Sequence, residues 1–437
     1  MTDRTQLEFR FPRCHRRGVE ASFSGGSVTS DGGVLLVRQA DRRTGLLSQA
    51  ARALGDARRQ ASCTHSLLSV LRQRVYGLCL GYEDLNDHAQ LREDIALQTA
   101  VDRDRPLASP PTLCRLENRA DRAAAWALHR VLVEQFIASF RRAPKELVLD
   151  FDATDDAVHG EQEGRFFHGY YDHYCFLPLY VFCGEHLLVA YLRPSKIDAA
   201  KHAWAILSLL VKRLRQAWPK VRIIFRGDSG FCRHAMLSWC ERHDVGYLVG
   251  VARNERLRVL SAGLLERAEH GYAETRTKQR IFGEVRYAAD SWRRTRRVIV
   301  KAEHADKGAN PRYVVTNLSG DPQELYDTLY CARGDIENRI KEQQLDLFAD
   351  RTSCHAWWAN QFRLLLASLA YTLLHTIRRV ALGGTELARA QCSTIRLRLL
   401  KIGAVVLRNT RRVRFLLSSS YPYQTVFARV AARLGVT

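Results

Sequence analysis

Three acidic residues stand where their carboxylates could act together. Asp152 and Asp228 each close a run typical of a strand, ELVLDFDAT and VRIIFRGD, and Glu337 lies in a long stretch with helical periodicity. In an α/β sheet, the carboxyl ends of strands near a change in strand order form the usual ligand crevice. If the two strands are neighbours, the two aspartates face each other. A carboxylate from a packed helix then completes a set of hard oxygen ligands that suits Mg²⁺.

Such a set has a definite chemistry. Two Mg²⁺ ions roughly 3.5–4 Å apart, bridged by a carboxylate, activate an attacking water or hydroxyl and stabilise the leaving oxygen of a phosphodiester. We therefore expect Asp152, Asp228 and Glu337 to be both metal ligands and catalytic residues, with Mn²⁺ able to substitute for Mg²⁺. The sequence predicts phosphoryl transfer.

The helix that carries Glu337 presents one polar stripe. Tyr330, Arg333, Glu337, Lys341 and Gln344 follow at steps of three, four, four and three, so they share a face. Taken alone, this stripe is more commonly an intrahelical ladder of ion pairs. The two strand-end aspartates, which need a cation nearby, favour the functional interpretation.

The charge balance indicates a polyanionic partner. Lys and Arg number 67 against 46 Asp and Glu, a formal charge of +21 with a pI near 9.8. A partner with dense negative charge is the leading expectation, and an acidic protein or a membrane surface remains an alternative. Together with the phosphoryl-transfer site, this charge favours double-stranded DNA. The longest near-apolar stretch, 364–374, has 11 residues, whereas a membrane-spanning helix needs roughly 20.

Other patterns set the expected compartment. The first residues contain no continuous apolar segment of a secretory signal, so we expect a cytoplasmic, nucleoid-associated protein without membrane attachment. Eleven cysteines without a CxxC pair indicate reduced thiols and neither a disulfide framework nor a zinc ribbon.

The periodicity changes along the chain and predicts a mixed α/β sheet covered by helices. The expected strands are 146–154, 173–182, 186–194, 221–228, 247–252 and 312–318, and the expected helices are 198–218, 232–243, 322–348 and 357–380.

Breakers and composition divide the chain into five segments. They are an N-terminal mainly helical DNA-binding domain (1–143), the first part of the catalytic core (144–252), a β-rich insertion (253–311), the second part of the core with the catalytic helix (312–381) and a basic C-terminal DNA-contacting segment (382–437).

Three segments are candidates for DNA contact. A short helix after Pro110 carries Arg115 and is either a recognition helix or, equally, an ordinary solvated basic helix. Residues 387–437 contain ten Lys or Arg and no Asp or Glu, including Arg411 and Arg412. The insertion contains Trp292 followed by Arg293 and Arg294, an aromatic side chain beside phosphate-binding cations.

The acidic motifs together resemble a known family. FDATDD, RGDSGF and YCARGDIENRIKE are similar to the three catalytic signatures of DDE transposases of bacterial insertion sequences, which have an RNase H-like fold. Within these, the chain resembles the group with a Tyr-x2-Arg-x3-Glu-x6-Lys signature, and in it insertion-sequence family thirteen-eighty. GYEDLNDHAQLRED, LRPSKIDAAKHA and RLLKIGA resemble the same family, so the likeness covers almost the whole chain.

The resemblance implies roles for further residues. Tyr330 and Arg333 match the family's Tyr and Arg and would hold DNA phosphate near the scissile bond, for which the guanidinium fork suits Arg. The final Lys of the signature falls on Gln344 here, and Lys341 is its candidate substitute. In related transposases the insertion holds a tryptophan that stacks on a flipped base, and Trp292 is the candidate for it; the alternative is a cross-strand aromatic in a small sheet.

The first aspartate is ambiguous. Asp150 shares a strand face with Asp152, and Asp155 and Asp156 follow closely. We prefer Asp152 because it begins the Asp-x-Thr match.

The expected function is therefore a DNA transposase that binds terminal inverted repeats, cleaves the element's ends and joins the 3′ ends to target DNA, acting as a homodimer. Two alternatives remain: a Mg²⁺-dependent nuclease of the same fold without strand transfer, and a non-catalytic DNA-binding repressor derived from a transposase.

Overall fold

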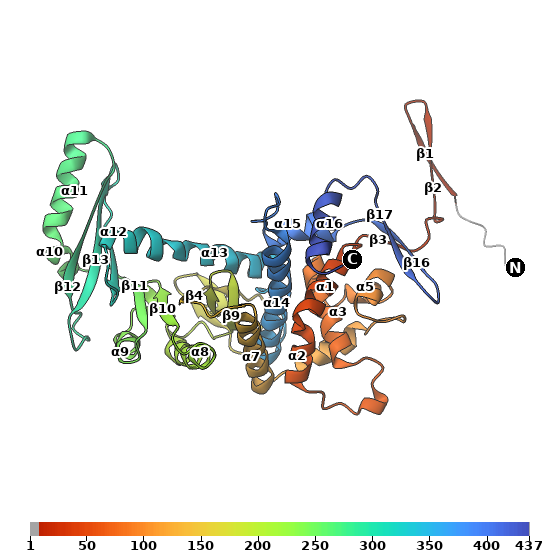
Figure 1. The fold of residues 1–437 in the computed structure, drawn as a ribbon, viewed down its shortest axis with the longest axis horizontal. Helices are drawn as coiled ribbons and strands as arrows, with labels where there is room; N and C mark the ends of the chain where they lie inside the picture. Colours follow the sequence, from red (N-terminus) through yellow and green to blue (C-terminus); the bar gives the residue numbers. More distant parts are fainter. Residues whose placement is uncertain (1–7, 437) are drawn as a thin grey trace. The chain divides into compact units, whose positions relative to one another are not determined.

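The computed structural model describes residues 8–436; residues 1–7 and 437, the ends of the predicted first and last segments, lie outside the described residues. The chain forms two compact units (Figure 1). The first unit comprises Met1–Arg119, Asp346–Phe348 and Leu369–Thr437, and the second comprises Ala120–Leu345 and Ala349–Ser368.

The second unit contains a nine-stranded mixed sheet in the order β12-β13-β15-β11-β10-β4-β8-β9, with β14 paired to β13. Strand β10 lies parallel to both β4 and β11, and the other pairs are antiparallel. The strands are β4 Glu146–Ala153, β8 Leu179–Cys183, β9 His186–Tyr191, β10 Arg222–Gly227, β11 Gly246–Val251, β12 Gln279–Tyr287, β13 Arg296–Ala305, β14 Gly308–Ala309 and β15 Arg312–Thr316.

Helices cover both faces of this sheet, which gives the mixed α/β architecture expected from the sequence (Figure 1). Helices α7 (Arg122–Ala138), α8 (Ala203–Ala217) and α9 (His234–Arg242) pack on the face that carries Phe151 and Phe225. The opposite face carries Ile224 and packs against Tyr326.

That opposite face is covered by the helical stretch that contains Glu337. Its segments follow without a break: α12 Pro322–Glu324, η3 Leu325–Tyr330, η4 Cys331–Arg333, α13 Gly334–Lys341 and η5 Glu342–Asp346. The predicted single helix over 322–348 is therefore helical for most of its length, with changes of helix type inside it. Since side chains alternate along a strand, Asp150 and Asp152 face this stretch while Phe151 faces the other way.

Two segments differ from the sequence-based expectation. The predicted strand 173–182 is broken near Pro178 into β7 (His173–Phe176) and β8, and β7 pairs instead with β5 (Asp156–Ala157) and β6 (Phe166–His168). Proline lacks the N–H that a ladder needs, which explains the break.

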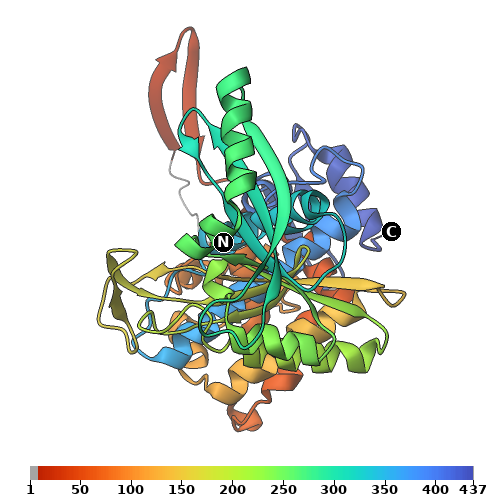
Figure 2. The same cartoon turned by 90° about the vertical axis from the view of Figure 1, so that its left-hand side faces the viewer.

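The segment expected as a β-rich insertion contains both helices and strands. Helices α10 (Glu255–Leu260) and α11 (Ala262–Thr275) precede β12 and β13, and α11 packs along these strands (Figure 2). Because β13 pairs with β15, the strands of this segment continue the core sheet and form no sheet of their own.

The first unit is mainly helical. Its helices are α1 Val34–Thr44, α2 Leu46–Leu54, η1 Gln60–Ser62, α3 Leu67–Leu80, α4 His88–Leu91, α5 Ile95–Ala100, α6 Pro110–Asn118, η6 Arg378–Leu382, α15 Cys392–Ile395, η7 Arg396–Leu400 and α16 Gln424–Arg433. Its strands are β1 Glu8–Cys14, β2 Arg17–Ser22, β3 Val28–Thr29, β16 Ala404–Arg408 and β17 Val413–Leu417. Helix α7, expected in the N-terminal domain, belongs to the second unit because it packs on β9.

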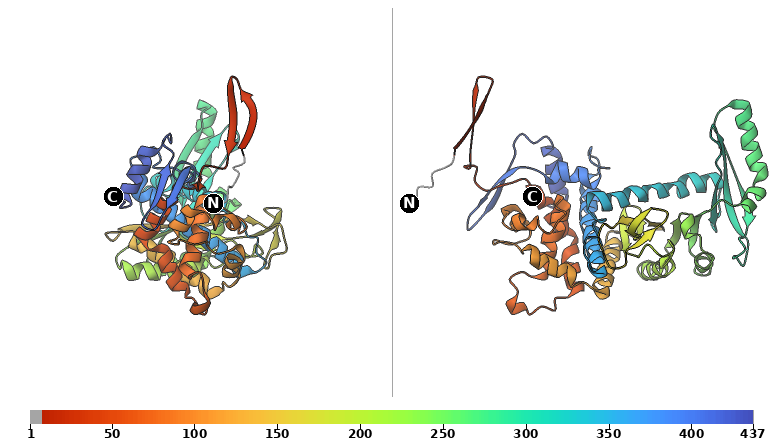
Figure 3. Two further views of the ribbon diagram at one scale, coloured as in Figure 1. Left: turned by 90° about the vertical axis from the view of Figure 1, so that its right-hand side faces the viewer. Right: turned by 180° about the vertical axis from the view of Figure 1, so that it is seen from behind.

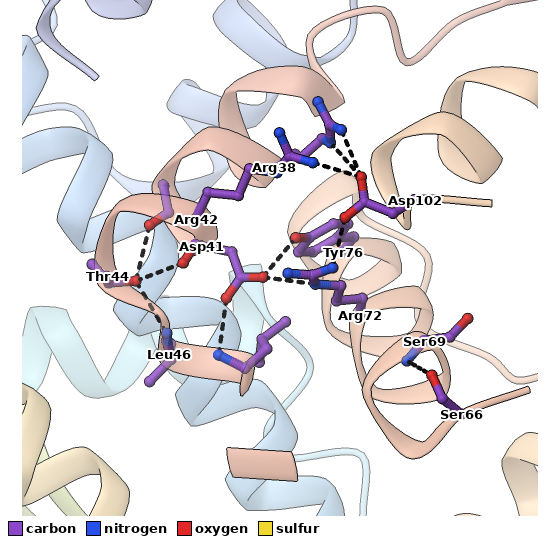
Figure 4. A network of polar contacts seen from close by, with 12 residues as sticks. Arg38, Asp41, Arg42, Thr44, Leu46, Ser66, Ser69, Arg72, Tyr76 and Asp102 are labelled. Carbon is purple, nitrogen blue, oxygen red and sulfur yellow. Dashed lines mark hydrogen bonds and ion pairs between the residues drawn. The ribbon is translucent and has the colours of Figure 1, made fainter. Parts of the chain in front are cut away.

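A buried carboxylate ties the helices of the first unit together (Figure 4). Asp41 on α1 accepts hydrogen bonds from Arg72 Nε and Tyr76 Oη on α3, each 2.9 Å long. Arg72 also bonds Asp102, which in turn accepts from Arg38. The network satisfies a fully buried charge, which would otherwise be costly.

Two further features complete the fold. Among the described residues the β1–β2 hairpin pairs only with itself and is exposed throughout (Figure 3).

Helix α14 (Trp357–Ile377) begins in the second unit and ends in the first. Within residues 8–436, every helix is too short or too polar to cross a membrane.

Candidate active site

Asp152 and Asp228 lie at the same edge of the sheet. Strands β4 and β10 are parallel neighbours, and Phe151 of β4 pairs with Gly227 of β10. The residue that follows is Asp152 on β4 and Asp228 after β10. The two strands are therefore neighbours, as the predicted arrangement of the aspartates requires.

The backbone after β10 holds Asp228 in a fixed turn. Asp228 caps the short helix η2 (Ser229–Phe231), and its Oδ1 atom accepts a hydrogen bond of 2.8 Å from the Gly230 amide. A Cβ at Gly230 would lie 3.0 Å from that same oxygen, so the turn favours glycine there. The bond fixes one carboxylate oxygen and orients the carboxyl group.

Glu337 and Arg333 face this edge from the helical stretch. Arg333 Nη1 lies 3.6 Å from Asp152 Oδ2, and Arg333 Nη2 lies 3.5 Å from Glu337 Oε1. Glu337 is exposed, whereas Arg333 and Asp152 are largely covered. Arg333 therefore links two of the three carboxylates, one across the fold and one a helical turn away.

Tyr330 reaches the turn after β10 through a gap left by Gly250. A Cβ at Gly250 would lie 2.7 Å from Tyr330 Oη and 2.9 Å from the Ser229 amide nitrogen. Gly250 is a residue that the sequence argument missed. A lone glycine inside the apolar run YLVGVA was the available signal, since such a glycine commonly marks close approach of another group.

The carboxylates influence one another electrostatically. Burial raises the pKa of Asp152 to about 7; the charge of Arg333 opposes this shift, and those of Asp228 and Glu337 add to it. The site thus concentrates negative charge in a partly desolvated place.

This charge environment fits a divalent cation. The three side chains offer only hard oxygen donors, and a cation would offset the repulsion from Asp228 and Glu337 that adds to the effect of burial on the pKa of Asp152. In the described residues no three His, Cys, Asp or Glu side chains are already gathered around one point. The Arg333 guanidinium is the cation beside the carboxylates in this structure.

Asp150 has a different partner. It accepts two hydrogen bonds from Arg226 on β10, one of them 2.7 Å long, and both side chains are buried. Arg226 also donates to the Leu329 carbonyl, which ties the sheet to the helical stretch. This geometry makes Asp150 part of a structural ion pair and leaves Asp152 as the available carboxylate. An arginine inside the apolar run VRIIFRGD was the signal for such a buried pair.

Gln344, at the signature's Lys position, points into the fold. Its Nε2 atom donates to the Asp155 carbonyl at 2.9 Å and to Asp156 Oδ1 at 2.7 Å. Asp156 is fully buried, and burial raises its pKa to about 8. Lys341 is exposed one turn after Glu337. Gln344 therefore joins the helix to the segment after Asp152, and Lys341 is left as the accessible cation.

Trp292 packs at the edge of the core. Its ring lies 5.4 Å from that of Tyr287 and 5.0 Å from the guanidinium carbon of Arg296, and it is half-buried. Arg294 pairs with Glu241, and Arg293 is exposed. These contacts give Trp292 a packing role, and its stacking on a DNA base stays a prediction.

The candidates in the first unit are exposed. Arg115 on α6 donates to Thr112 Oγ1 at 3.0 Å. Arg411 and Arg412 form the turn between β16 and β17, where the Asn409 side chain accepts from both their amides. Exposure leaves all three guanidinium groups accessible to DNA.

A family model described as "Transposase DDE domain group 1" matches residues 11–436. No curated protein matches significantly. Among solved structures, a cryo-EM structure of the piggyBac transposase synaptic complex with hairpin DNA is similar with a TM-score of 0.39 and 11% identity, covering 84% of this chain and 79% of that chain.

Proposed function

The chain belongs to the DDE transposase family, group 1, and is a DDE-type DNA transposase; we propose that it binds the terminal inverted repeats of its element, cleaves the ends and joins the 3′ ends to target DNA. One observation carries the proposal: Asp152 and Asp228 end adjacent parallel strands, and Arg333 places the Glu337 helix against Asp152.

We assign the roles by position. Asp152, Asp228 and Glu337 would hold two Mg²⁺ ions, with Mn²⁺ as a substitute; when bound, such ions activate the attacking oxygen and stabilise the leaving one. Tyr330 and Arg333 would hold the phosphate beside the scissile bond, and Lys341 would contact it from one turn further along. Hydrolysis by water and attack by a 3′ hydroxyl are both in-line displacements, so one site serves both steps.

The finer classification is also part of the proposal. We assign the chain to insertion-sequence family thirteen-eighty and its core to the RNase H-like fold, on the motifs FDATDD, RGDSGF and YCARGDIENRIKE. We further propose a cytoplasmic protein of bacterial origin that acts as a homodimer, because two ends must be cut and paired.

The test uses a supercoiled plasmid carrying the DNA that flanks the gene, purified protein and Mg²⁺. We expect nicking at the ends of inverted repeats and, with precleaved ends, joining to a second plasmid. Cleavage without joining would favour the nuclease, and binding without nicking would favour the repressor. Asp228→Asn serves as the matched inactive control because it keeps the shape of the side chain.

A further inference from the structure

The segment 194–202, here called the β9–α8 loop, lies beside the turn that carries Asp228. It connects β9 to α8 within the second unit. Its sequence, PSKIDAAKH, carries two lysines, Lys196 and Lys201, whose side chains are exposed.

A buried arginine fixes the shape of the loop. Arg193 is fully buried, and its Nη1 atom donates to the Ala199 and Lys201 carbonyls at 2.8 and 2.7 Å. Its Nε atom donates to the Leu177 carbonyl at 2.8 Å. Among the described residues Arg193 forms no ion pair, and the nearby charge of Asp198 acts on it from within the loop. Two of these three carbonyls belong to the loop, so one planar group fixes the loop backbone and joins it to Leu177.

The start of the loop rests on the small sheet that follows Asp152. Pro194 forms a β-bridge with Phe176, and Ser195 Oγ donates to the Phe166 carbonyl at 2.8 Å. The Lys196 ammonium lies 4.7 Å from the centre of the Phe166 ring. This sheet contains β5, whose first residue comes four positions after Asp152.

The end of the loop rests on the turn that carries Asp228. A Cβ at Gly230 would lie 3.5 Å from Ala199 Cβ, so the loop is in contact with that turn. Asp198 pairs with Arg233, which caps α9. That pair neutralises the acidic residue of the loop. Lys196 and Lys201 form no ion pair with any residue in the described part of the chain.

We propose that the β9–α8 loop is a DNA phosphate clamp beside the catalytic centre, in which Lys196 and Lys201 contact the backbone of the bound end and Arg193 is the positioning residue. The inference rests on the proposed function because the ligand is the DNA end that the site cleaves. Exposed, unpaired cations on a rigid backbone are the feature that phosphate binding needs. The positive charge of the two ammonium groups attracts the phosphate backbone.

The test measures the salt dependence of binding to a labelled duplex copied from the DNA that flanks the gene, in EDTA so that no cleavage occurs. The double variant Lys196→Gln/Lys201→Gln should lower the slope of log affinity against log salt by about 2, since each phosphate contact contributes about 0.9. The matched control is Lys212→Gln/Lys220→Gln, which removes the same charge from exposed positions on α8 and the turn after it. Equal slopes for the two double variants would overturn the proposal.

A second measurement tests the role of Arg193. Arg193→Lys keeps the charge but cannot bridge three carbonyls, so it should weaken binding, and adding it to the loop lysine variant should cost little more. Fully additive losses would show that Arg193 does not act through the loop. Nicking with Mg²⁺ is measured in parallel. A wild-type protein that binds DNA but never nicks it contradicts the proposed function. In that case the difference in salt dependence between the two double variants still tests the phosphate clamp.

Discussion

The guanidinium of Arg333 lies 3.6 Å from the Oδ2 atom of Asp152, across the boundary between helix and sheet. The same guanidinium lies 3.5 Å from Glu337 Oε1. This contact places the catalytic helix against the strand that carries the first aspartate. We propose that Arg333 orients these carboxylates and also receives a phosphate oxygen.

We predict that Arg333→Ala lowers the single-turnover nicking rate roughly 10²-fold, the usual cost of removing one group that stabilises transition-state charge. Arg333→Lys should recover only part of the rate because a lysine lacks the planar fork. Arg339→Lys, on the same helix but paired with Glu185 at 3.1 Å, is the control and should retain nearly the wild-type rate. Equal rates for the Arg333 and Arg339 variants would contradict this role.

Substitutions of Asp150 and Asp152 should have different effects, the first on stability and the second on nicking. Asp152→Asn should abolish nicking and leave folding intact. Asp150→Asn weakens the partner of a buried arginine, so it should lower the free energy of unfolding by as much as about 3–5 kcal/mol, the range for breaking a buried pair. Urea unfolding and nicking of bound DNA separate the two effects. If Asp150→Asn is stable and inactive while Asp152→Asn cleaves, the assignment is reversed.

Metal binding should release a proton. Burial and neighbouring charge raise the pKa of Asp152 to about 7, so below that pH the metal-free carboxyl is protonated and must lose its proton to bind Mg²⁺. Affinity for Mg²⁺ should therefore fall as the pH drops below about 7. Calorimetry in two buffers with different ionisation enthalpies measures the proton released. The same affinity well below and well above pH 7 would argue against Asp152 as a ligand.

The buried Asp156 should make stability depend on pH. Its pKa is about 8 in the fold against 3.8 for the exposed group, so between these values the native state holds a proton that the unfolded chain has lost. Its contribution to stability is complete below about pH 4 and is lost as the pH rises toward 8. Asp156→Asn, which is neutral, should stabilise the protein near pH 8 and change little near pH 4 in urea unfolding. Glu161→Gln, an exposed position, is the control and should show no such trend.

Substitutions of Trp292 distinguish a packing role from a role in base stacking. Trp292→Ala removes contacts with Tyr287 and Arg296, and because the side chain is only half-buried we expect a loss of roughly 2 kcal/mol, less than the ~3–5 typical of fully buried aromatics. Trp292→Phe keeps a ring and should lose less. End processing is then compared under conditions where each variant is folded. A wild-type rate and hairpin yield for folded Trp292→Ala would exclude the stacking role.

Local patterns in the sequence determined much of this protein. Short runs of β-branched and aromatic residues, bounded by Gly, Pro and Asp, predicted β4 and β10 and placed Asp152 and Asp228 at their ends. Helical spacing put Tyr330, Arg333 and Glu337 on one stretch, and the structure confirms that this stretch is helical. These features depend on residues close together in the chain, which is why they could be predicted.

Only the tertiary structure shows how the partners of similar residues differ, and our choice of Asp152 for the site rests on that difference. Asp150 and Asp152 share a strand face, and the register of β4 with β10 gives Arg226 to Asp150 alone. Gln344 was expected on the polar stripe, yet it turns to the buried Asp156. The strands of the insertion looked independent, but pairing of β13 with β15 joins them to the core sheet. Each outcome depends on partners distant in sequence, whose distances and burial are fixed only when the sheet and its helices pack together.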